Sequence, residues 1–168
     1  MGRVLADSIL SHWSQGIDGL QASSQAFYDS VLAGLDVYKL KDVKTQRVDF
    51  RESGIFSTKR EYLQVRRGPH VYHICAAPYG NTFFVSSWLG ETEKGIWAWL
   101  KRQPVVGFFV RNLIKPITYF QIDTAMIFQS MVHNTVLHVV DELTKASGVR
   151  QLTEAERKPI MRDFFATH

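Results

Sequence analysis

Apolar and polar residues alternate through the middle of the chain. In residues 62–67, Leu63 and Val65 alternate with polar side chains, which is the period of a half-buried strand. Residues 71–77 and 82–89 are apolar on both alternations, and a strand with two apolar faces must be covered on both sides. Turn residues separate these segments, Gly68-Pro69 and Gly80-Asn81. The pattern therefore predicts three neighbouring antiparallel strands, with the last two in the middle of a sheet.

Residues 43–51 predict a fourth strand of a different kind. Charged side chains occupy both of its alternations, and charge on a strand discourages edge-to-edge pairing. The segment therefore suits the edge of the sheet. Glu52-Ser53-Gly54 then turns the chain back towards the apolar strands, so we expect a four-stranded antiparallel meander.

The spacing of apolar residues predicts helices on both sides of the sheet. One apolar stripe recurs at helical spacing and is formed by Leu5, Ile9, Trp13, Ile17 and Leu20. Gly16 and Gly19 weaken its second half, so the stripe predicts a helix over about residues 3–14. Ser23 or Ser24 can cap a second helix that runs to about residue 35. These two helices would precede the sheet.

The longest helix is predicted over residues 122–146, where apolar residues cluster on one side. Gly148 supplies an ordinary stop. Residues 153–156, Thr-Glu-Ala-Glu, form a capping box that opens a last short helix in a tail with apolar residues for docking. We expect the long helix to lie across one face of the sheet. The other face then needs cover from the aromatic residues before the helix or from a second subunit.

Together these elements predict one α+β domain over residues 1–168. Its expected parts are N-terminal helices over 1–40, an antiparallel sheet over 43–90, an aromatic and basic segment over 91–118, and the long helix with a docked tail over 119–168. The chain is long enough for a proper hydrophobic core. No internal repeat or low-complexity linker divides it.

Composition narrows the setting without naming an activity. The 45% apolar and 12% aromatic content argue against disorder. One cysteine allows no intrachain disulfide and fits a reducing compartment, so we expect a cytoplasmic protein. Polar residues near the start interrupt any signal sequence, and no apolar run approaches the ~20 residues that a spanning helix needs. The net charge of +4 is compatible with nucleic acid or anionic lipid but implies neither.

Cys75 with His73 is the sharpest enzymatic candidate. Residues two apart on a strand point to the same face, so the imidazole could activate the thiol. The neighbours of Cys75 are apolar, however, which is typical of a free cysteine that serves as a small buried hydrophobe. A reactive thiolate needs a partly exposed, electropositive setting. We therefore predict a buried, inert Cys75 and no catalytic residue.

The histidines do not predict a metal site. His133 and His138 are five residues apart, about 140° around a helix, so they diverge. His138 and Glu142 have the four-residue gap of a helical zinc pair, but two ligands are too few. The sequence also lacks the glycine-rich phosphate-binding motifs and the nucleophile elbow. We expect no metal and no cofactor.

Two surfaces remain as candidate contact sites. The first combines Met and aromatic residues, which interface cores prefer: Trp97, Trp99, Phe108, Phe109, Met126, Ile127, Met131 and Leu137. It supports the leading hypothesis, a non-enzymatic interaction module that self-associates as a homo-oligomer or docks to a larger protein assembly. Tryptophans and basic residues around residues 96–114 also suit a membrane interface, so peripheral attachment to an anionic membrane is the alternative.

The second surface is basic and supports a third hypothesis. Five arginines fall on neighbouring predicted strands with aromatic residues among them: Arg47, Arg51, Arg60, Arg66 and Arg67. Cations beside aromatic platforms bind single-stranded nucleic acid in several sheet folds. Acidic residues interrupt this patch, so a solvated sheet edge is the simpler interpretation. Nucleic acid therefore ranks below a protein partner and a membrane.

Overall fold

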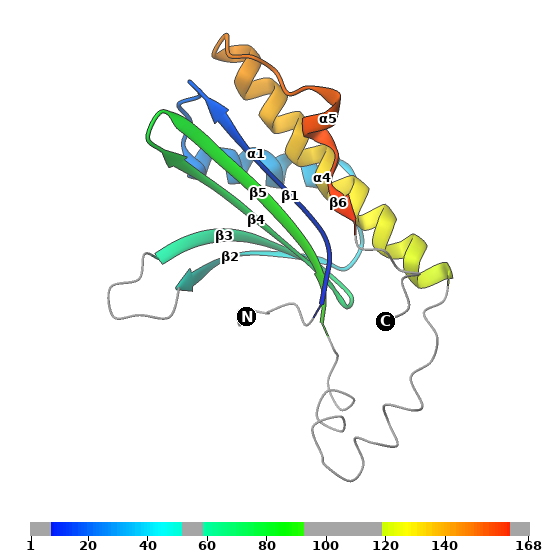
Figure 1. The fold of residues 1–168 in the computed structure, drawn as a ribbon. Coiled ribbons are helices and arrows are strands. Elements are labelled where there is room, and N and C mark those ends of the chain that lie inside the picture. Colours follow the sequence, from blue (N-terminus) through cyan, green and yellow to red (C-terminus); the bar gives the residue numbers. More distant parts are fainter. Residues whose placement is uncertain (1–7, 52–58, 93–118, 162–168) are drawn as a thin grey trace.

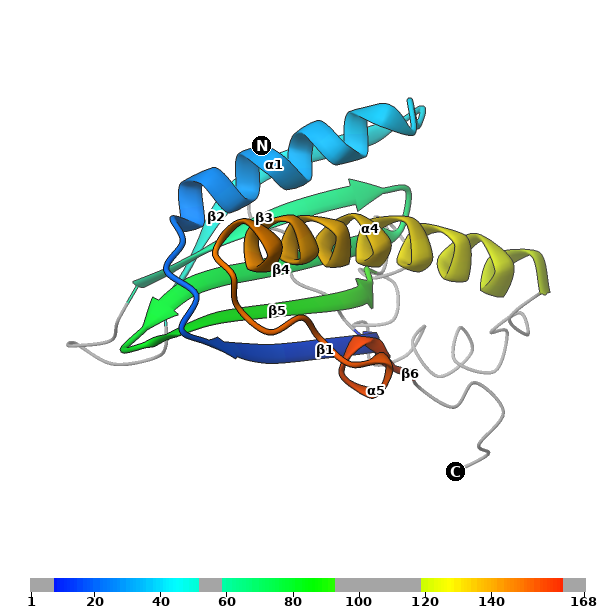
Figure 2. The same ribbon diagram turned by 90° about the horizontal axis from the view of Figure 1, so that it is seen from above.

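A computed structural model describes residues 8–51, 59–92 and 119–161 of the chain. One sheet forms the first layer, and two helices on a single face form the second (Figures 1 and 2). The elements in chain order are β1 (Ser8–Asp18), α1 (Ser24–Val37), β2 (Val43–Arg51), β3 (Lys59–Arg67), β4 (His70–Tyr79), β5 (Thr82–Glu91), α4 (Tyr119–Ala146), α5 (Glu154–Arg157) and β6 (Ile160–Met161). The predicted α+β class is confirmed at this level.

The sheet is antiparallel, with the strand order β2-β3-β4-β5-β1-β6. The strands β2 to β5 form the expected meander, joined at two of their turns by Gly68 and Gly80 in the left-handed region. The charged strand β2 lies at an edge, and the doubly apolar strands β4 and β5 lie inside the sheet, as predicted. The described sheet has six strands rather than about four, because segments near both ends of the chain add to it.

The prediction of a helix over residues 3–14 is wrong, since residues 8–18 form β1. A spacing of four residues, as from Trp13 to Ile17, puts two side chains on one face of a strand as well as of a helix. Both residues are buried here against the helices. Gly16 also disfavours a helix interior, and its partner in the sheet is Phe84 on β5. The strand is long enough to pair with β5 along nearly its whole length.

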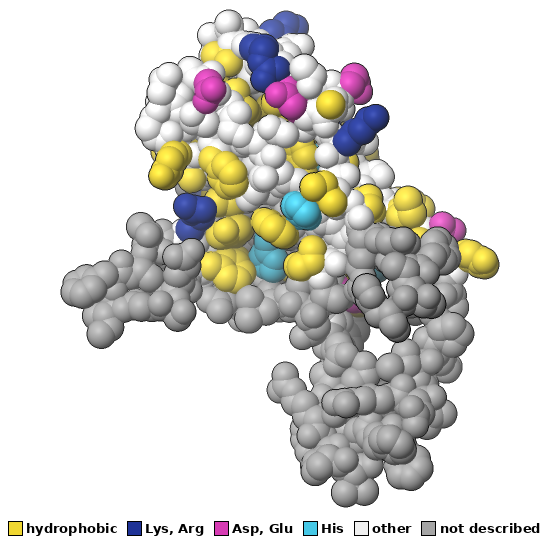
Figure 3. Space-filling model, in the orientation of Figure 1, with side chains coloured by type: hydrophobic (Ala, Val, Ile, Leu, Met, Phe, Trp, Pro, Cys, Tyr) yellow, Lys and Arg dark blue, Asp and Glu magenta, His cyan; other side chains and the backbone are white. Residues whose placement is uncertain are grey.

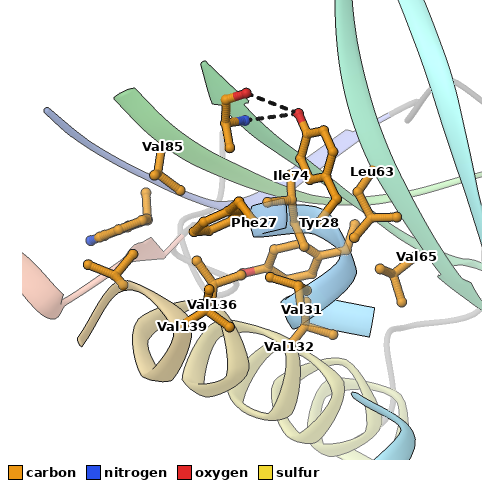
Figure 4. Close-up of a cluster of buried hydrophobic side chains, with 14 of the residues drawn as sticks. Phe27, Tyr28, Val31, Leu63, Val65, Ile74, Val85, Val132, Val136 and Val139 are labelled. Carbon is orange, nitrogen blue, oxygen red and sulfur yellow. Dashed lines mark hydrogen bonds between the residues drawn. The ribbon is translucent and has the colours of Figure 1, made fainter. Parts of the chain in front are cut away.

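The two long helices, α1 and α4, form where the sequence predicted them. Ser23 caps α1, with its hydroxyl accepting from the amide of Ala26. The long helix α4 begins at residue 119, slightly before the predicted start. Both helices pack on the same sheet face, where Figure 4 shows their side chains meeting those of β3, β4 and β5 in one core. The inward residues of that cluster include Phe27, Val31, Leu63, Val65, Ile74, Val85, Val132, Val136 and Val139.

The C-terminal tail docks on β1 and α4 chiefly through polar contacts. The indole of Trp13 donates to the carbonyl of Glu156 at 2.6 Å, and His133 Nε2 lies 2.7 Å from the carbonyl of Arg157. Arg157 also pairs with Asp141 on α4, with a closest distance of 2.6 Å. The predicted capping box at Thr153 is present and opens α5. The last described residues then pair with β1 as β6.

Candidate functional site

The first candidate surface lies on the N-terminal half of α4. Large apolar side chains are exposed there by 80% at Tyr119, 79% at Phe120, 47% at Met126 and 56% at Ile127. Tyr119 and Met126 are seven residues apart, as are Phe120 and Ile127. Seven residues make almost two helical turns, so the four side chains share one face. We call these four residues the α4 stripe.

The remaining predicted contact residues fall into two groups. Met131 and Leu137 are half-buried, and Leu137 packs against the hydrophobic core. Trp97, Trp99, Phe108 and Phe109 lie outside the described residues, as does the whole segment 96–114. The α4 stripe therefore keeps Met126 and Ile127 from the predicted set and adds two aromatic residues. Tyr119 and Phe120 lie seven residues before Met126 and Ile127, and this spacing was the sequence signal that could have identified the two aromatic residues.

The charge around the α4 stripe is unusual for a helix of 28 residues. Asp123 is exposed and lies between Tyr119 and Ile127 on the same face. The sequence of the helix contains no lysine or arginine before Lys145, in its last turn. The α4 stripe is thus apolar with a central negative charge. None of the helices that the structure describes is long and apolar enough to cross a membrane.

The predicted basic patch is divided between the two faces of the sheet. Arg47 lies on the helix side, where it forms an ion pair with Asp29 of α1 at 2.7 Å. Arg60 and Arg66 alternate onto the opposite face, which we call the outer face, and Arg67 returns to the helix side. The side chain of Arg51 lies outside the described part. The described arginines therefore do not form one continuous surface.

Cys75 is buried, as predicted, and the register places it on the outer face. Burial raises the pKa of its thiol, an effect that the nearby Arg60 guanidinium and a hydrogen bond from Tyr62 oppose. His73 lies on the same face, but its Nε2 is 3.2 Å from Gln64 Oε1, and its ring meets the ring of Phe50 edge-on. A thiol with a raised pKa is a poor nucleophile. This geometry does not provide thiol catalysis.

The sheet opens between β3 and β4, and this opening was not predicted from the sequence. The β3–β4 register runs from Arg67 opposite His70 to Leu63 opposite Ile74, and there it stops. Beyond this point β2 and β3 curve away from β4, as Figure 1 shows. The β4–β5 register continues to the hairpin turn. Residues 75–79 of β4 therefore pair with β5 but not with β3.

Tyr28 of α1 occupies the point where the ladder stops. Its hydroxyl accepts from the amide of Ala76 at 3.0 Å and donates to the carbonyl of Glu61 at 2.9 Å. In a continued ladder these two backbone groups would bond directly. The phenol thus relays the missing ladder bond, and Figure 4 shows it reaching from α1 to β4.

Pro78 explains why the ladder does not resume. Tyr79 and Thr82 close a two-residue turn, so antiparallel alternation directs the backbone of Tyr79 and Ala77 to β5 and that of Pro78 to β3. Proline has no amide hydrogen to donate in that direction. Pro78 in an otherwise apolar strand was the sequence signal for this opening.

An open groove lies on the outer face beside this opening. It has a volume of about 310 Å³ and is lined by Arg60, Ala77, Pro78, Tyr79, Thr82 and Phe84. Phe84 and Ala77 contribute apolar surface, and Arg60 contributes a positive charge. Figure 3 shows hydrophobic side chains and histidine gathered on this side of the sheet. The groove is the second candidate site, and we call it the outer groove.

A buried polar layer lies on the opposite side, between the sheet and α4. Burial raises the pKa of Tyr72 to about 12, an effect that the polar side chains of Ser87 and Gln129 beside its hydroxyl oppose. Four buried polar atoms in this region have no partner within hydrogen-bond geometry among the described residues: Ser11 Oγ, Ser87 Oγ, Gln129 Nε2 and His133 Nδ1. Burial also lowers the pKa of His133. Both shifts favour the uncharged form of the side chain. The described residues contain no group of three His, Cys, Asp or Glu side chains that could hold a metal ion.

Comparisons with known proteins identify no family. No family model matches the chain, and no curated protein matches it. Among solved structures, the chain is similar to the crystal structure of TTHA0849 from Thermus thermophilus, with 15% sequence identity and a TM-score of 0.26. That match covers 76% of this chain and 96% of the other. A TM-score this low supports no inference about fold or function.

Proposed function

We propose that the protein is a non-enzymatic interaction module that self-associates through the α4 stripe. The observation that carries this proposal is the high exposure of Tyr119 and Phe120, each about four-fifths exposed on a regular helix. Large apolar side chains gathered on one exposed face mark contact sites, because their burial removes apolar area from water. Aromatic residues and Met are also the types that interface cores prefer.

The α4 stripe is complementary to itself. An antiparallel pair of α4 helices with its two-fold axis at Asp123 would place Tyr119 opposite Ile127 of the other copy. It would also place Phe120 opposite Met126. Each aromatic ring then meets an aliphatic side chain, and every contact occurs twice, as a two-fold interface requires. A second copy of this chain is therefore the partner that fits the pattern.

The size and charge of the α4 stripe predict a weak dimer. An aromatic side chain buries about 150–250 Å² when fully covered, so the four residues offer roughly 500 Å² per copy. A standard interface buries about 800 Å² per partner. The two Asp123 carboxylates would also approach each other at the axis, and like charges repel. We therefore expect association that depends on protein concentration and strengthens when this charge is removed.

The charge pattern disfavours an anionic membrane as the partner of the α4 stripe. Surfaces that bind anionic lipid carry lysine and arginine around their apolar residues. The α4 stripe has Asp123 at its centre instead, and the first cation on the helix is Lys145, five turns beyond the stripe. Membrane attachment through residues 96–114 stays a separate prediction.

Light scattering after size exclusion, over a range of protein concentrations, tests the proposal. The wild-type mass should rise above the 19.3 kDa of one chain as concentration increases. Phe120→Glu with Ile127→Glu should abolish the rise, and Asp123→Asn should move it to lower concentration. Asn134→Glu, at an exposed position further along the helix, is the control and should leave the mass unchanged. A wild-type protein that stays monomeric at the highest concentration would refute self-association, and comigration of that monomer with anionic liposomes would support the membrane alternative.

A further inference from the structure

The outer groove lies on the face of the sheet opposite α1 and α4, so it is separate from the core. It is built by two neighbouring strands of the meander, β4 and β5, and by Arg60 from the diverging strand β3. Because β3 pairs with β4 only from Leu63 to Arg67, Arg60 lies outside the ladder between these two strands. The opening therefore places the positive charge of Arg60 beside the apolar surface of Ala77 and Phe84, at a point where β3 does not pair with β4.

The positive charge of Arg60 is available to a ligand. Its side chain is exposed, and within the described residues no carboxylate forms an ion pair with it. The hydroxyl of Tyr62 lies beside its guanidinium, which opposes the rise that burial causes in the pKa of that phenol. A guanidinium has five N–H donors, so this contact leaves most of them free. Arginine binds carboxylates in a planar, two-point geometry that a neutral group cannot reproduce.

The rest of the outer groove suits an apolar group of limited size. The ring of Phe84 is half-buried, Ala77 is half-buried beside it, and Tyr79 is 77% exposed at the rim. The hydroxyl of Thr82 already donates to Asp18 at 2.6 Å. The volume of about 310 Å³ is at the lower limit of ligand sites, which range over roughly 300–1,000 Å³. The groove therefore has room for one small ring or short chain.

We infer that the outer groove binds a small organic carboxylate, with the carboxylate on Arg60 and the apolar part against Phe84 and Ala77. A single guanidinium beside apolar walls matches one negative charge on an apolar body. A nucleotide offers several charges and exceeds the volume. A simple inorganic anion would leave the apolar surface exposed to water. Charge complementarity and size thus select the same class of ligand.

A matched pair of probes tests this inference on the full chain. We choose 3-phenylpropanoate and 3-phenylpropanol, which share one apolar skeleton and differ in the charged group. Binding is followed by the amide shifts in two-dimensional nitrogen–proton NMR spectra. The carboxylate should shift the amides of residues 60 and 77–84, and should bind at least tenfold more tightly than the alcohol, because a charge-assisted hydrogen bond contributes about that factor.

Two variants separate the outer groove from general surface charge. Arg60→Gln should reduce the affinity for 3-phenylpropanoate at least tenfold and leave that for 3-phenylpropanol unchanged. Arg66→Gln removes a charge from the same strand and the same face, outside the groove, and should change neither affinity. Ala77→Leu, which fills the floor, should weaken both probes. The inference is overturned if neither probe binds up to its solubility limit. It is also overturned if the shifted amides lie elsewhere, or if both arginine variants have the same effect.

Discussion

The hydroxyl of Tyr28 gives the sharpest test of how this sheet is held. Tyr28→Phe removes one oxygen from a fully buried ring and leaves the apolar contacts of the ring in place. The relay between Ala76 and Glu61 is lost, so the amide of Ala76, in a residue only 2% exposed, has no partner. The substitution therefore isolates the contribution of the relay from that of the core.

The expected cost follows from the burial of these groups. A buried donor without a partner costs about 1–3 kcal/mol, whereas the half-buried carbonyl of Glu61 is closer to solvent and loses less. We expect the free energy of unfolding to fall by about 2 kcal/mol. For a chain of 168 residues, each kcal/mol changes the melting temperature by roughly 2–4 °C, so Tm should fall by about 4–8 °C.

Urea unfolding and hydrogen exchange measure the two consequences separately. Urea unfolding gives the change in free energy, and exchange of the Ala76 amide should become faster in Tyr28→Phe. Tyr79→Phe is the control, because Tyr79 lies on β4 like Ala76 but is 77% exposed. Its free energy of unfolding should stay within about 0.5 kcal/mol of the wild-type value. A loss below about 0.5 kcal/mol for Tyr28→Phe, with unchanged protection at Ala76, would refute the relay. It would mean that β3 and β4 close and pair directly once the hydroxyl is gone.

Two further predictions concern pH and helix packing. Burial raises the pKa of Tyr72 from 10.0 to about 12. The contribution of the neutral phenol to stability is therefore present below pH 10 and is lost as pH rises towards 12. Tyr72→Phe should flatten the decline in the free energy of unfolding over this pH range. A Cβ added at Gly34 of α1 would lie 2.7 Å from the methyl group of Thr135 on α4. Gly34→Ala should therefore destabilise the protein in thermal unfolding despite its gain of about 1 kcal/mol in helix propensity, and Thr135→Ser should reverse the sign by removing that methyl group. If Gly34→Ala alone stabilised the protein, this result would contradict the close contact between position 34 and Thr135.

Several parts of the fold could be predicted because their signals are local. Alternation specified β2 to β5, and the charge on β2 placed it at an edge. Ser23 and Thr153 marked helix starts through contacts within three residues. The apolar surroundings of Cys75 predicted its burial. Each of these inferences needs only neighbouring residues and one periodicity.

The sequence was ambiguous where two periodicities agree. Trp13 and Ile17 fit a helix and a strand equally well, and pairing with β5 decides between them. The basic residues looked continuous along the chain, but alternation places Arg47 and Arg60 on opposite faces once the register is known. Of the predicted contact residues, Leu137 turned out to pack on the core, because the placement of α4 against the sheet fixes which positions are covered.

The sequence by itself determined the class of each central strand, the two long helices and the absence of recognisable catalytic motifs, because these depend on residue type and short-range spacing. Only the tertiary structure decided where the sheet opens. That opening requires a hydroxyl from α1, the backbone of β3 and a proline on β4 to meet at one place, although 50 residues separate Tyr28 from Pro78. Pro78 is a local signal for one of these groups, but no local pattern reports that all three meet, since only the folding of the chain brings them together. The outer groove beside the opening was therefore invisible in the sequence.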